Sequence, residues 1–322
     1  MKVLAFSTGG AHITTMLGML QELEAQKRLE GLDGFAGISA GAILAAFCAT
    51  RPISEALKQL KSILVEHCTD AIKPHYKWLN VPLSALFQKS ILDDSGLAEI
   101  LRQQLEGKPL LAELYIGLTN ETEMTYELHH FSKDGTSSGG LSIGQAVHAS
   151  ASIPVIFEGE EVNACHYSDG GVYHQIPAFA IEQLLKSAHD NKDESFDLTI
   201  IASSTWKYRP AAGTSSMPYL AKKTLHFLDC VNYNNLPSDR ELIKEAIELY
   251  KPLIKIDFKM YAVPTELLRS LHQRFTMSKL AEIGMDDVDK LLALGERIVR
   301  ANCATYAIEQ DEPSPLMNHL KY

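Results

Sequence analysis

The sequence predicts an α/β fold with a mostly parallel sheet. Lys2–Phe6 is a short apolar run that ends at glycines, as a buried strand does, and apolar residues then recur at helical spacing over 13–30. Phe35–Gly37 is a second apolar run, and a glycine–serine turn leads from it into the small-residue stretch Ala42–Ala49. The order strand, loop, helix, strand, turn and helix is typical of parallel strands connected by helices.

The composition is that of a globular protein and argues against several functions. The chain has 322 residues, of which 46% are hydrophobic and 22% charged, and its net charge is −10. Because it has neither a basic stripe nor an arginine-rich run, we do not expect it to bind nucleic acid. The acidic charge also opposes strong attraction to anionic membranes, although brief contact with a membrane surface is compatible with it.

The cysteines and the N-terminus indicate a cytoplasmic protein. The five cysteines are scattered and form no C-x-x-C pair, so the sequence predicts neither a metal site nor a redox motif, and we expect no cofactor. An odd number of cysteines without a pattern of disulfide pairs fits a reducing compartment. The apolar run after Lys2 stops at Ser7, which is too short for a secretory signal, and no apolar stretch is long enough to span a membrane.

The rest of the chain continues to alternate between helical and strand-like segments. We predict strands over 114–118, 125–131, 198–204 and 254–263, and helices over 54–67, 96–105, 141–150, 178–188, 219–232, 238–250, 265–271 and 286–302. The chain shows no internal repeat and no linker. The prediction is therefore a single domain over 1–322, with a core over about 1–210 and a C-terminal extension over 211–322 packed on that core.

Residues 53–107 form a helix-rich insertion with an apolar centre at Pro74–Leu92. One interpretation is a pair of helices packed on the core. The other is an apolar cap over a functional site, or a surface that touches lipid. The first is favoured because scattered apolar residues usually belong to the core.

The pentapeptide Gly37-Ile38-Ser39-Ala40-Gly41 has two interpretations. G-x-S-x-G occurs in ordinary turns, and it also places a nucleophilic serine on a strained bend between a strand and a helix. In the second case the glycines let strand and helix approach each other, and the helix directs its N–H groups at the site. The motif alone leaves both interpretations open.

Two further segments carry chemically useful groups. The glycine loop, Ser7–His12, opens the first helix, and its amides at Gly9 and Gly10 are suited to an oxyanion hole. A nucleotide phosphate loop is disfavoured because the usual glycine patterns are missing, whereas a tight turn without a ligand stays open. Downstream, Asp169-Gly170-Gly171 offers a carboxylate, although such a triplet also occurs as a plain hairpin bend.

Together these segments resemble the patatin-like phospholipase family, from Lys2 to about Pro210. The family's glycine-rich segment matches Thr8–Ile13, and its nucleophile elbow matches Gly37–Gly41. Its D-G-G motif matches Asp169–Gly171, and the wider stretch His148–Pro177 is similar to the family's A-S-x-x-I-P-x-x-F … D-G-G … P pattern. The resemblance implies a three-layer α/β/α sandwich with a mostly parallel central sheet, and a helical cap insertion over about 53–107.

The resemblance also implies a mechanism. Ser39 would be the nucleophile and Asp169 the proton acceptor, without a catalytic histidine, and the reaction would pass through a covalent acyl-enzyme. The oxyanion donors would be the amides of Gly9, Gly10, Ala11 and Ala40, with Gly37, Gly41, Gly170 and Gly171 as supporting glycines. No metal is implied, and the expected substrate is a phospholipid or another acyl lipid.

The chain departs from the family pattern in the glycine loop. His12 stands where the family usually has a basic residue, and Thr8 and Ile13 stand where it has glycines. Loss of the fixed cation is expected to weaken the organisation of the loop or to alter oxyanion stabilisation. Two alternatives to a lipid acyl hydrolase therefore stay open: a serine esterase or thioesterase for soluble acyl substrates, and a catalytically silent lipid-binding protein. The oligomeric state is open too, a homodimer included.

Overall fold

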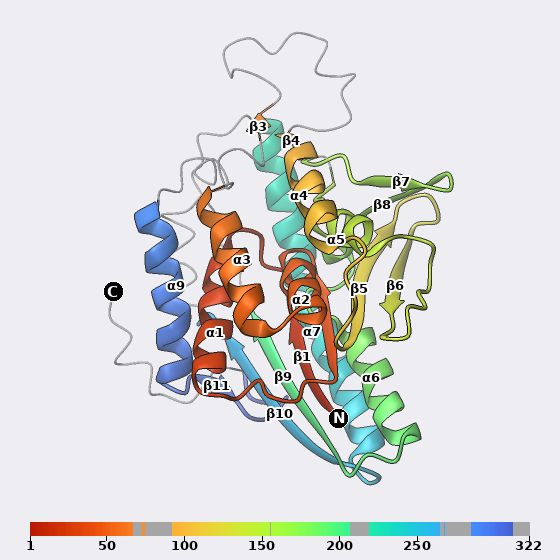
Figure 1. The fold of residues 1–322 in the computed structure, drawn as a ribbon, viewed down its shortest axis with the longest axis vertical. Coiled ribbons are helices and arrows are strands. Elements are labelled where there is room, and N and C mark those ends of the chain that lie inside the picture. Colours follow the sequence, from red (N-terminus) through yellow and green to blue (C-terminus); the bar gives the residue numbers. More distant parts are fainter. Residues whose placement is uncertain are drawn as a thin grey trace.

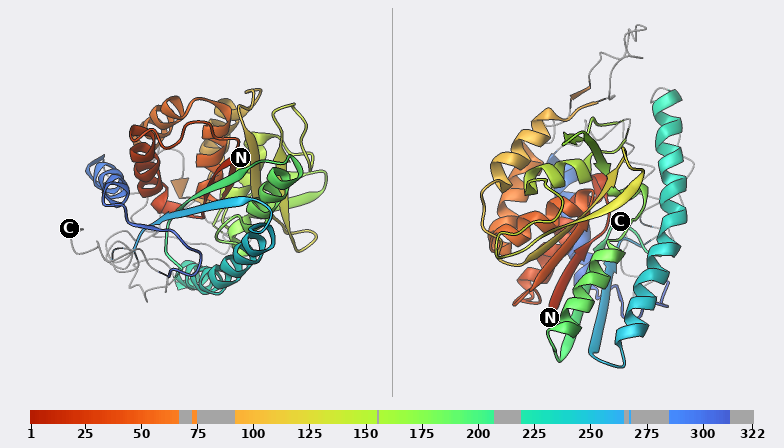
Figure 2. Two further views of the ribbon diagram at one scale, coloured as in Figure 1. Left: turned by 90° about the horizontal axis from the view of Figure 1, so that it is seen from below. Right: turned by 90° about the vertical axis from the view of Figure 1, so that its right-hand side faces the viewer.

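The computed structural model describes residues 1–66, 73–74, 92–154, 156–206, 219–264, 267 and 285–311. Within these residues a nine-stranded mixed sheet lies between two layers of helices (Figures 1 and 2). Its strands are β1 (Lys2–Phe6), β2 (Gly34–Ile38), β5 (Glu113–Asn120), β6 (Thr125–Phe131), β7 (Glu160–Val162), β8 (Cys165–Asp169), β9 (Ser195–Ala202), β10 (Lys255–Ala262) and β11 (Ala304–Thr305). The α/β fold predicted from the sequence is confirmed.

The five central strands are parallel, in the order β10-β9-β1-β2-β5. Strands β6 and β8 both pair antiparallel with β5, β7 pairs with β8, and β11 closes the other edge. The chain adds β2 on one side of β1 and later returns to add β9 on the other side. In open α/β sheets, functional sites lie at the carboxyl ends of the strands beside such a reversal.

Helices cover both faces of the sheet. One layer contains the short η1 (Gly10–His12), α1 (Ile13–Ala25), α2 (Ala40–Thr50), α3 (Ile53–Glu66), α4 (Ser95–Leu105) and α5 (Ile143–Ala151). Figure 2 shows α6 (Ala178–Asp190) and α7 (Tyr219–Tyr250) on the opposite face. After β8 the chain makes the short η3 (Gly170–Val172), and a small separate ladder joins β3 (Lys73–Pro74) and β4 (Leu92–Asp93).

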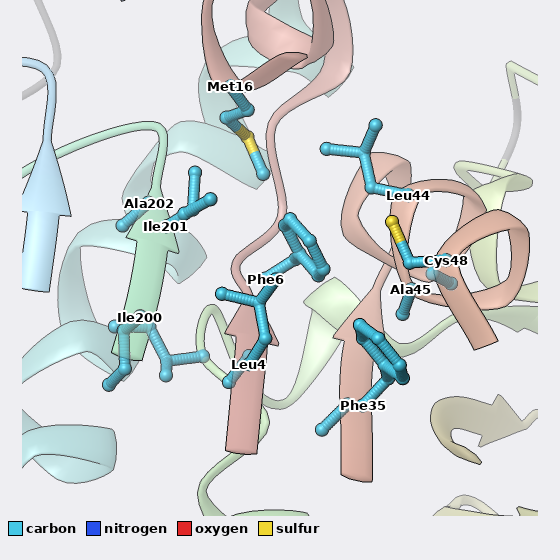
Figure 3. Close-up of a cluster of buried hydrophobic side chains, with 14 of the residues drawn as sticks. Leu4, Phe6, Met16, Phe35, Leu44, Ala45, Cys48, Ile200, Ile201 and Ala202 are labelled. Atoms are coloured by element: carbon cyan, nitrogen blue, oxygen red, sulfur yellow. The ribbon is translucent and has the colours of Figure 1, made fainter. Parts of the chain in front are cut away.

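The core lies between the central strands and helices α1 and α2 (Figure 3). Phe6 of β1 and Phe35 of β2 are buried next to Leu44 of α2 and Met16 of α1. Burial of a side chain of this size stabilises the fold by about 1.5–3 kcal/mol. The alanine-rich sequence of α2 is buried on almost every side, which explains why that helix lacks a polar face.

The C-terminal helix α9 (Met285–Arg300) packs directly on α1 through two glycines. A Cβ atom on Gly18 would lie 2.1 Å from the carbonyl oxygen of Leu292, and one on Gly295 would lie 2.0 Å from that of Thr15. Only glycine allows backbones to approach this closely. The contact between α1 and α9 and the pairing of β10 with β9 both support a single domain over 1–322. The single domain stays a prediction.

The described helices of the insertion belong to the packed layer. Helix α3 contacts α1 and α2, and α4 contacts α5. This agrees with the interpretation as packed helices for 53–66 and 95–105. The cap interpretation depends on the apolar stretch 74–92, most of which lies outside the described residues, so it stays a prediction.

Helix α7 differs from the prediction. The sequence predicts two helices, 219–232 and 238–250, whereas the structure has one continuous helix with Pro237 inside it. A proline in a helix removes one hydrogen bond and normally interrupts the helix. Here the adjacent turn is fixed by burial of Leu236 and by Asp239, whose carboxylate accepts hydrogen bonds from another part of the chain. Tertiary contacts thus outweigh the local preference.

Candidate active site

The three segments singled out in the sequence meet at the carboxyl edge of the sheet. The glycine loop follows β1, Ser39 follows β2, and Asp169 is the last residue of β8. Ile38 of β2 is level with Gly117 of β5, and Leu118 of β5 is level with Asp169. Ser39 and Asp169 therefore lie at the same height on the two sides of β5. The side chain of Ser39 lies beside the Asp169 carboxyl group and favours its charged form.

Ser39 occupies a strained bend. Its backbone angles are φ 59° and ψ −130°, a left-handed conformation that is unfavourable for a residue with a side chain. The residue is only 5% exposed. Such strain persists only where neighbouring contacts hold it, and at functional sites it commonly orients a reacting group.

The glycines on both sides of Ser39 are required by packing. A Cβ atom on Gly37 would lie 2.3 Å from the carbonyl oxygen of Gly41, and one on Gly41 would lie 2.4 Å from that of Ser7. Strand β1, strand β2 and helix α2 thus touch through backbone atoms at this point. The same close approach brings the glycine loop next to the serine, because a Cβ on Gly9 would lie 3.6 Å from the Cβ of Ala40.

Asp169 is buried, and its own turn holds the carboxyl group. Its Oδ1 accepts a 2.7 Å hydrogen bond from the N–H of Gly171, and its carbonyl oxygen accepts one of 2.8 Å from the hydroxyl of Thr119. Burial raises the pKa of the carboxyl group to about 7, although the hydrogen bonds from Gly171 and Ser39 favour the charged form. A carboxylate with this pKa is suited to accept and return a proton near neutral pH.

Ser150 and Ser152 hold the backbone of Ser39 and Asp169 through hydrogen bonds. Ser150 Oγ accepts a 2.9 Å hydrogen bond from the N–H of Ser39 and donates one of 2.7 Å to the carbonyl oxygen of Gly117. The carbonyl oxygen of Ser152 accepts a 2.9 Å bond from the N–H of Asp169. Sequence reasoning did not assign these serines, although they lie in the A-S-x-x-I-P stretch that carried part of the resemblance. The pattern was therefore a usable signal for their supporting role.

The backbone N–H groups of the glycine loop differ in whether they are free to bind an oxyanion. The N–H of Thr8 donates to the carbonyl oxygen of Gln175, and that of His12 donates to Gly9, so neither amide can serve an oxyanion. Gly9, Gly10 and Ala11 lie between Thr8 and His12, and Gly10 adopts a positive φ of 47°. Ala40 begins α2, so its N–H has no acceptor within that helix.

Buried ion pairs anchor the helix that precedes the site. His148 of α5 contacts Asp94 at 3.0 Å and Glu160 at 2.8 Å, and Glu160 also contacts Arg102 at 2.6 Å. Burial lowers the pKa of the imidazole, but hydrogen bonds and charge from Asp94 and Glu160 outweigh this effect and raise it to about 9. His148 therefore has a structural role and is charged at neutral pH.

This charge predicts a pH-dependent stability. Because the pKa of His148 is higher in the folded than in the unfolded protein, its contribution is complete below about pH 6.5 and is lost as the pH rises through about 9. We expect His148→Gln to reduce the free energy of unfolding by about 3 kcal/mol at pH 6.5 and by much less at pH 10. Urea unfolding at a series of pH values measures this difference. The exposed His189→Gln is the control, and a pH-independent deficit in His148→Gln would contradict the prediction.

The described residues contain neither a cluster of three or more histidine, cysteine, aspartate or glutamate side chains placed for a metal ion nor a helix that could cross a membrane. Among the described residues, the buried histidines pair with carboxylates other than Asp169: His129 with Glu127, His148 with Asp94 and Glu160, and His174 with Asp239. The assignment of an aspartate rather than a histidine as the proton acceptor stays a prediction.

Residues 4–181, more than half of the chain, match the sequence model of the patatin-like phospholipase family. The chain belongs to this family. The family consists of carboxylic ester hydrolases. Ser39, Asp169 and the glycine loop all lie inside the matched range, whereas α7, β10 and α9 lie beyond it.

Comparison with solved structures gave distant matches. VipD from Legionella pneumophila is 14% identical with a TM-score of 0.36, and the match covers 91% of this chain and 66% of that one. ExoU of the Pseudomonas aeruginosa type III secretion system, in complex with SpcU, is 14% identical with a TM-score of 0.32, and the match covers 77% and 52%. The chain thus spans less than two thirds of each matched chain. A comparison with curated protein sequences gave no match.

Proposed function

We propose that the protein is a lipid acyl hydrolase of the phospholipase A type, which cleaves fatty-acyl esters through Ser39 and Asp169. One observation carries the proposal: a buried serine in a strained strand-to-helix bend lies beside a buried carboxyl group, whose charged form it favours. Membership of a family of carboxylic ester hydrolases supports the reaction class.

The geometry supports a two-step reaction. Asp169 accepts the hydroxyl proton as Ser39 Oγ attacks the acyl carbonyl carbon, and the tetrahedral intermediate collapses when the ester C–O bond breaks. The leaving alcohol takes the proton from Asp169, and the acyl group stays on Ser39. Water then loses a proton to Asp169 and attacks the acyl-enzyme, and the returning proton restores the serine hydroxyl as the fatty acid departs.

The negative charge that develops on the carbonyl oxygen needs donors. We assign this role to the amides of Gly9, Gly10 and Ala11, with that of Ala40 at the start of α2. The close approach of Gly9 to Ala40 supports this set, because both sides of one oxyanion would then be within reach of a donor. The positive end of the α2 dipole adds to the stabilisation.

A phospholipid or another acyl lipid is the proposed substrate, and no nucleic-acid partner is proposed. With a net charge of −10, contact with an anionic lipid surface would be brief. A cytoplasmic location and a single domain complete the proposal.

Covalent labelling tests the proposal and separates it from the alternatives. A fluorophosphonate probe is expected to modify Ser39 in the wild-type protein and to leave Ser39→Ala unmodified, as read by peptide mass spectrometry. Faster hydrolysis of micellar phospholipid than of a short-chain soluble ester is expected as well. The reverse preference would indicate a soluble esterase or thioesterase, and failure to label Ser39 would indicate a catalytically silent lipid-binding protein.

A further inference from the structure

We infer that Gln175 is a positioning residue that fixes the glycine loop against the Asp169 turn. The inference deepens the proposed function and depends on it for its catalytic consequence. Gln175 lies between η3 and α6, and its side chain is buried. Neither composition nor any motif singled it out.

Gln175 contacts both halves of the site. Its side-chain oxygen Oε1 accepts a hydrogen bond from Thr8 Oγ1, and its Nε2 donates a 2.9 Å bond to the carbonyl oxygen of Gly171. Its own carbonyl oxygen accepts a 2.8 Å bond from the N–H of Thr8. Gln175 thus makes two hydrogen bonds with Thr8 of the glycine loop and one with Gly171. The N–H of Gly171 in turn donates to the carboxylate of Asp169.

The orientation of the Gln175 amide is set by its partners. The carbonyl oxygen of Gly171 can only accept, so Nε2 must face it, and Oε1 then faces the hydroxyl of Thr8, which can donate. The two segments also touch, because a Cβ atom on Gly171 would lie 3.0 Å from Cγ2 of Thr8. One planar amide therefore sets the distance between the loop of the proposed oxyanion donors and the turn of the proposed base.

Helix α7 holds Gln175 from the other side. The N–H of Gln175 donates a 2.6 Å hydrogen bond to Asp239 Oδ2, and that of Ile176 donates one of 3.0 Å to the same atom. Asp239 Oδ1 lies 2.6 Å from Nδ1 of His174, and Asp239 is fully buried. The C-terminal part of the chain, beyond the residues that match the family, thus fixes the backbone from which the Gln175 side chain extends.

Thr8 makes this arrangement particular to the chain. In the family pattern that the sequence resembles, the position of Thr8 is a glycine, which has no hydroxyl to donate. We expected the departures in this loop to weaken its organisation. The Thr8 hydroxyl instead gives the loop an additional fixed contact.

Thr8→Val tests the inference, because valine keeps the shape and removes the hydroxyl, leaving Oε1 of Gln175 buried without this donor. We expect kcat for ester hydrolysis to fall about tenfold to a hundredfold with KM changed less than about threefold, since a small displacement of a catalytic group has this effect. Hydrogen exchange of the amides of residues 7–12 should become faster. Thr8→Ser should restore both properties, and Thr136→Val, which removes an exposed hydroxyl bonded to Asp134, is the matched control.

A double-mutant cycle with Gln175→Leu separates this contact from general damage to the fold. If Thr8 and Gln175 act through one bond, the double variant should have the same kcat as the less active of the two single variants. Additive losses would overturn the inference, as would wild-type kcat or wild-type exchange in Thr8→Val. If the wild-type protein neither hydrolyses esters nor reacts with the fluorophosphonate probe, the proposed function fails. Faster exchange in Thr8→Val that Thr8→Ser reverses would then still support the role of Gln175 in fixing the glycine loop.

Discussion

Asp169→Asn is expected to lower kcat for acyl-ester hydrolysis by about a thousandfold and to leave the fold intact. Asparagine keeps the shape of the side chain and can still accept the hydrogen bond of Gly171, but it cannot take up the serine proton. Loss of a positioned general base typically lowers the rate by about 10²–10⁴-fold. Steady-state kinetics with a phospholipid or soluble ester measure the loss, and circular dichroism verifies the fold.

The same substitution has an expected effect on stability in the opposite direction. Burial raises the pKa of Asp169 to about 7, so above that pH the folded protein contains a charged carboxylate that burial disfavours. Asp169→Asn removes this charge, and it should therefore be at least as stable as the wild type at pH 8 in thermal unfolding. An inactive variant that is also much less stable would show that Asp169 acts mainly on the fold.

The pH profile provides an internal control for this role. Protonated Asp169 cannot act as a base, so kcat/KM of the wild type should fall about tenfold per pH unit below a pKa near 7. The remaining activity of Asp169→Asn should lack this acid limb. A wild-type profile that is flat from pH 8 to pH 5 would contradict the assignment of Asp169 as the proton acceptor.

The main features of the fold could be predicted from the sequence because they rest on local patterns. The apolar runs Lys2–Phe6 and Phe35–Gly37 became β1 and β2 of a parallel sheet, with strand ends within one residue of the prediction. Glycines at positions 37 and 41 marked a close backbone approach, and the structure places that approach where strand, helix and glycine loop meet. The spacing of these residues along the chain was enough to predict the two strands and the close backbone approach, without knowledge of any long-range contact.

The supporting contacts could not be predicted, because they connect residues that are far apart in sequence. Gln175 meets Thr8 across 167 positions, and Ser150 meets Ser39 across 111. Nothing in the local sequence around Asp239 indicates a buried carboxylate, and there the proline at 237 predicts a helix end that tertiary contacts override. The pKa of Asp169 likewise depends on burial, which only the assembled fold determines.

Gly41→Ala is expected to destabilise the protein by about 3 kcal/mol and to slow the reaction of Ser39 with a fluorophosphonate probe about tenfold. Alanine is the better helix former and on propensity alone would stabilise α2. Its Cβ, however, would lie 2.4 Å from the carbonyl oxygen of Ser7 and 2.6 Å from that of Phe6, both backbone atoms that cannot rotate away. Helix α2 must then move relative to β1, and Ser39 and Ala40 must move with it.

Gly31→Ala is the matched control for this steric effect. A Cβ atom on Gly31 meets nothing within 4 Å, but its φ of 70° is unfavourable for alanine. It should therefore lose about 1 kcal/mol from backbone strain and react with the probe at the wild-type rate. Urea unfolding and labelling kinetics on both variants decide the outcome. If Gly41→Ala were as stable and as reactive as the control, the contact between β1 and α2 would not be what holds the serine in its bend. Because Ser7 belongs both to that contact and to the glycine loop, loss of the contact should reduce the reactivity of Ser39 and the stabilisation of the oxyanion together.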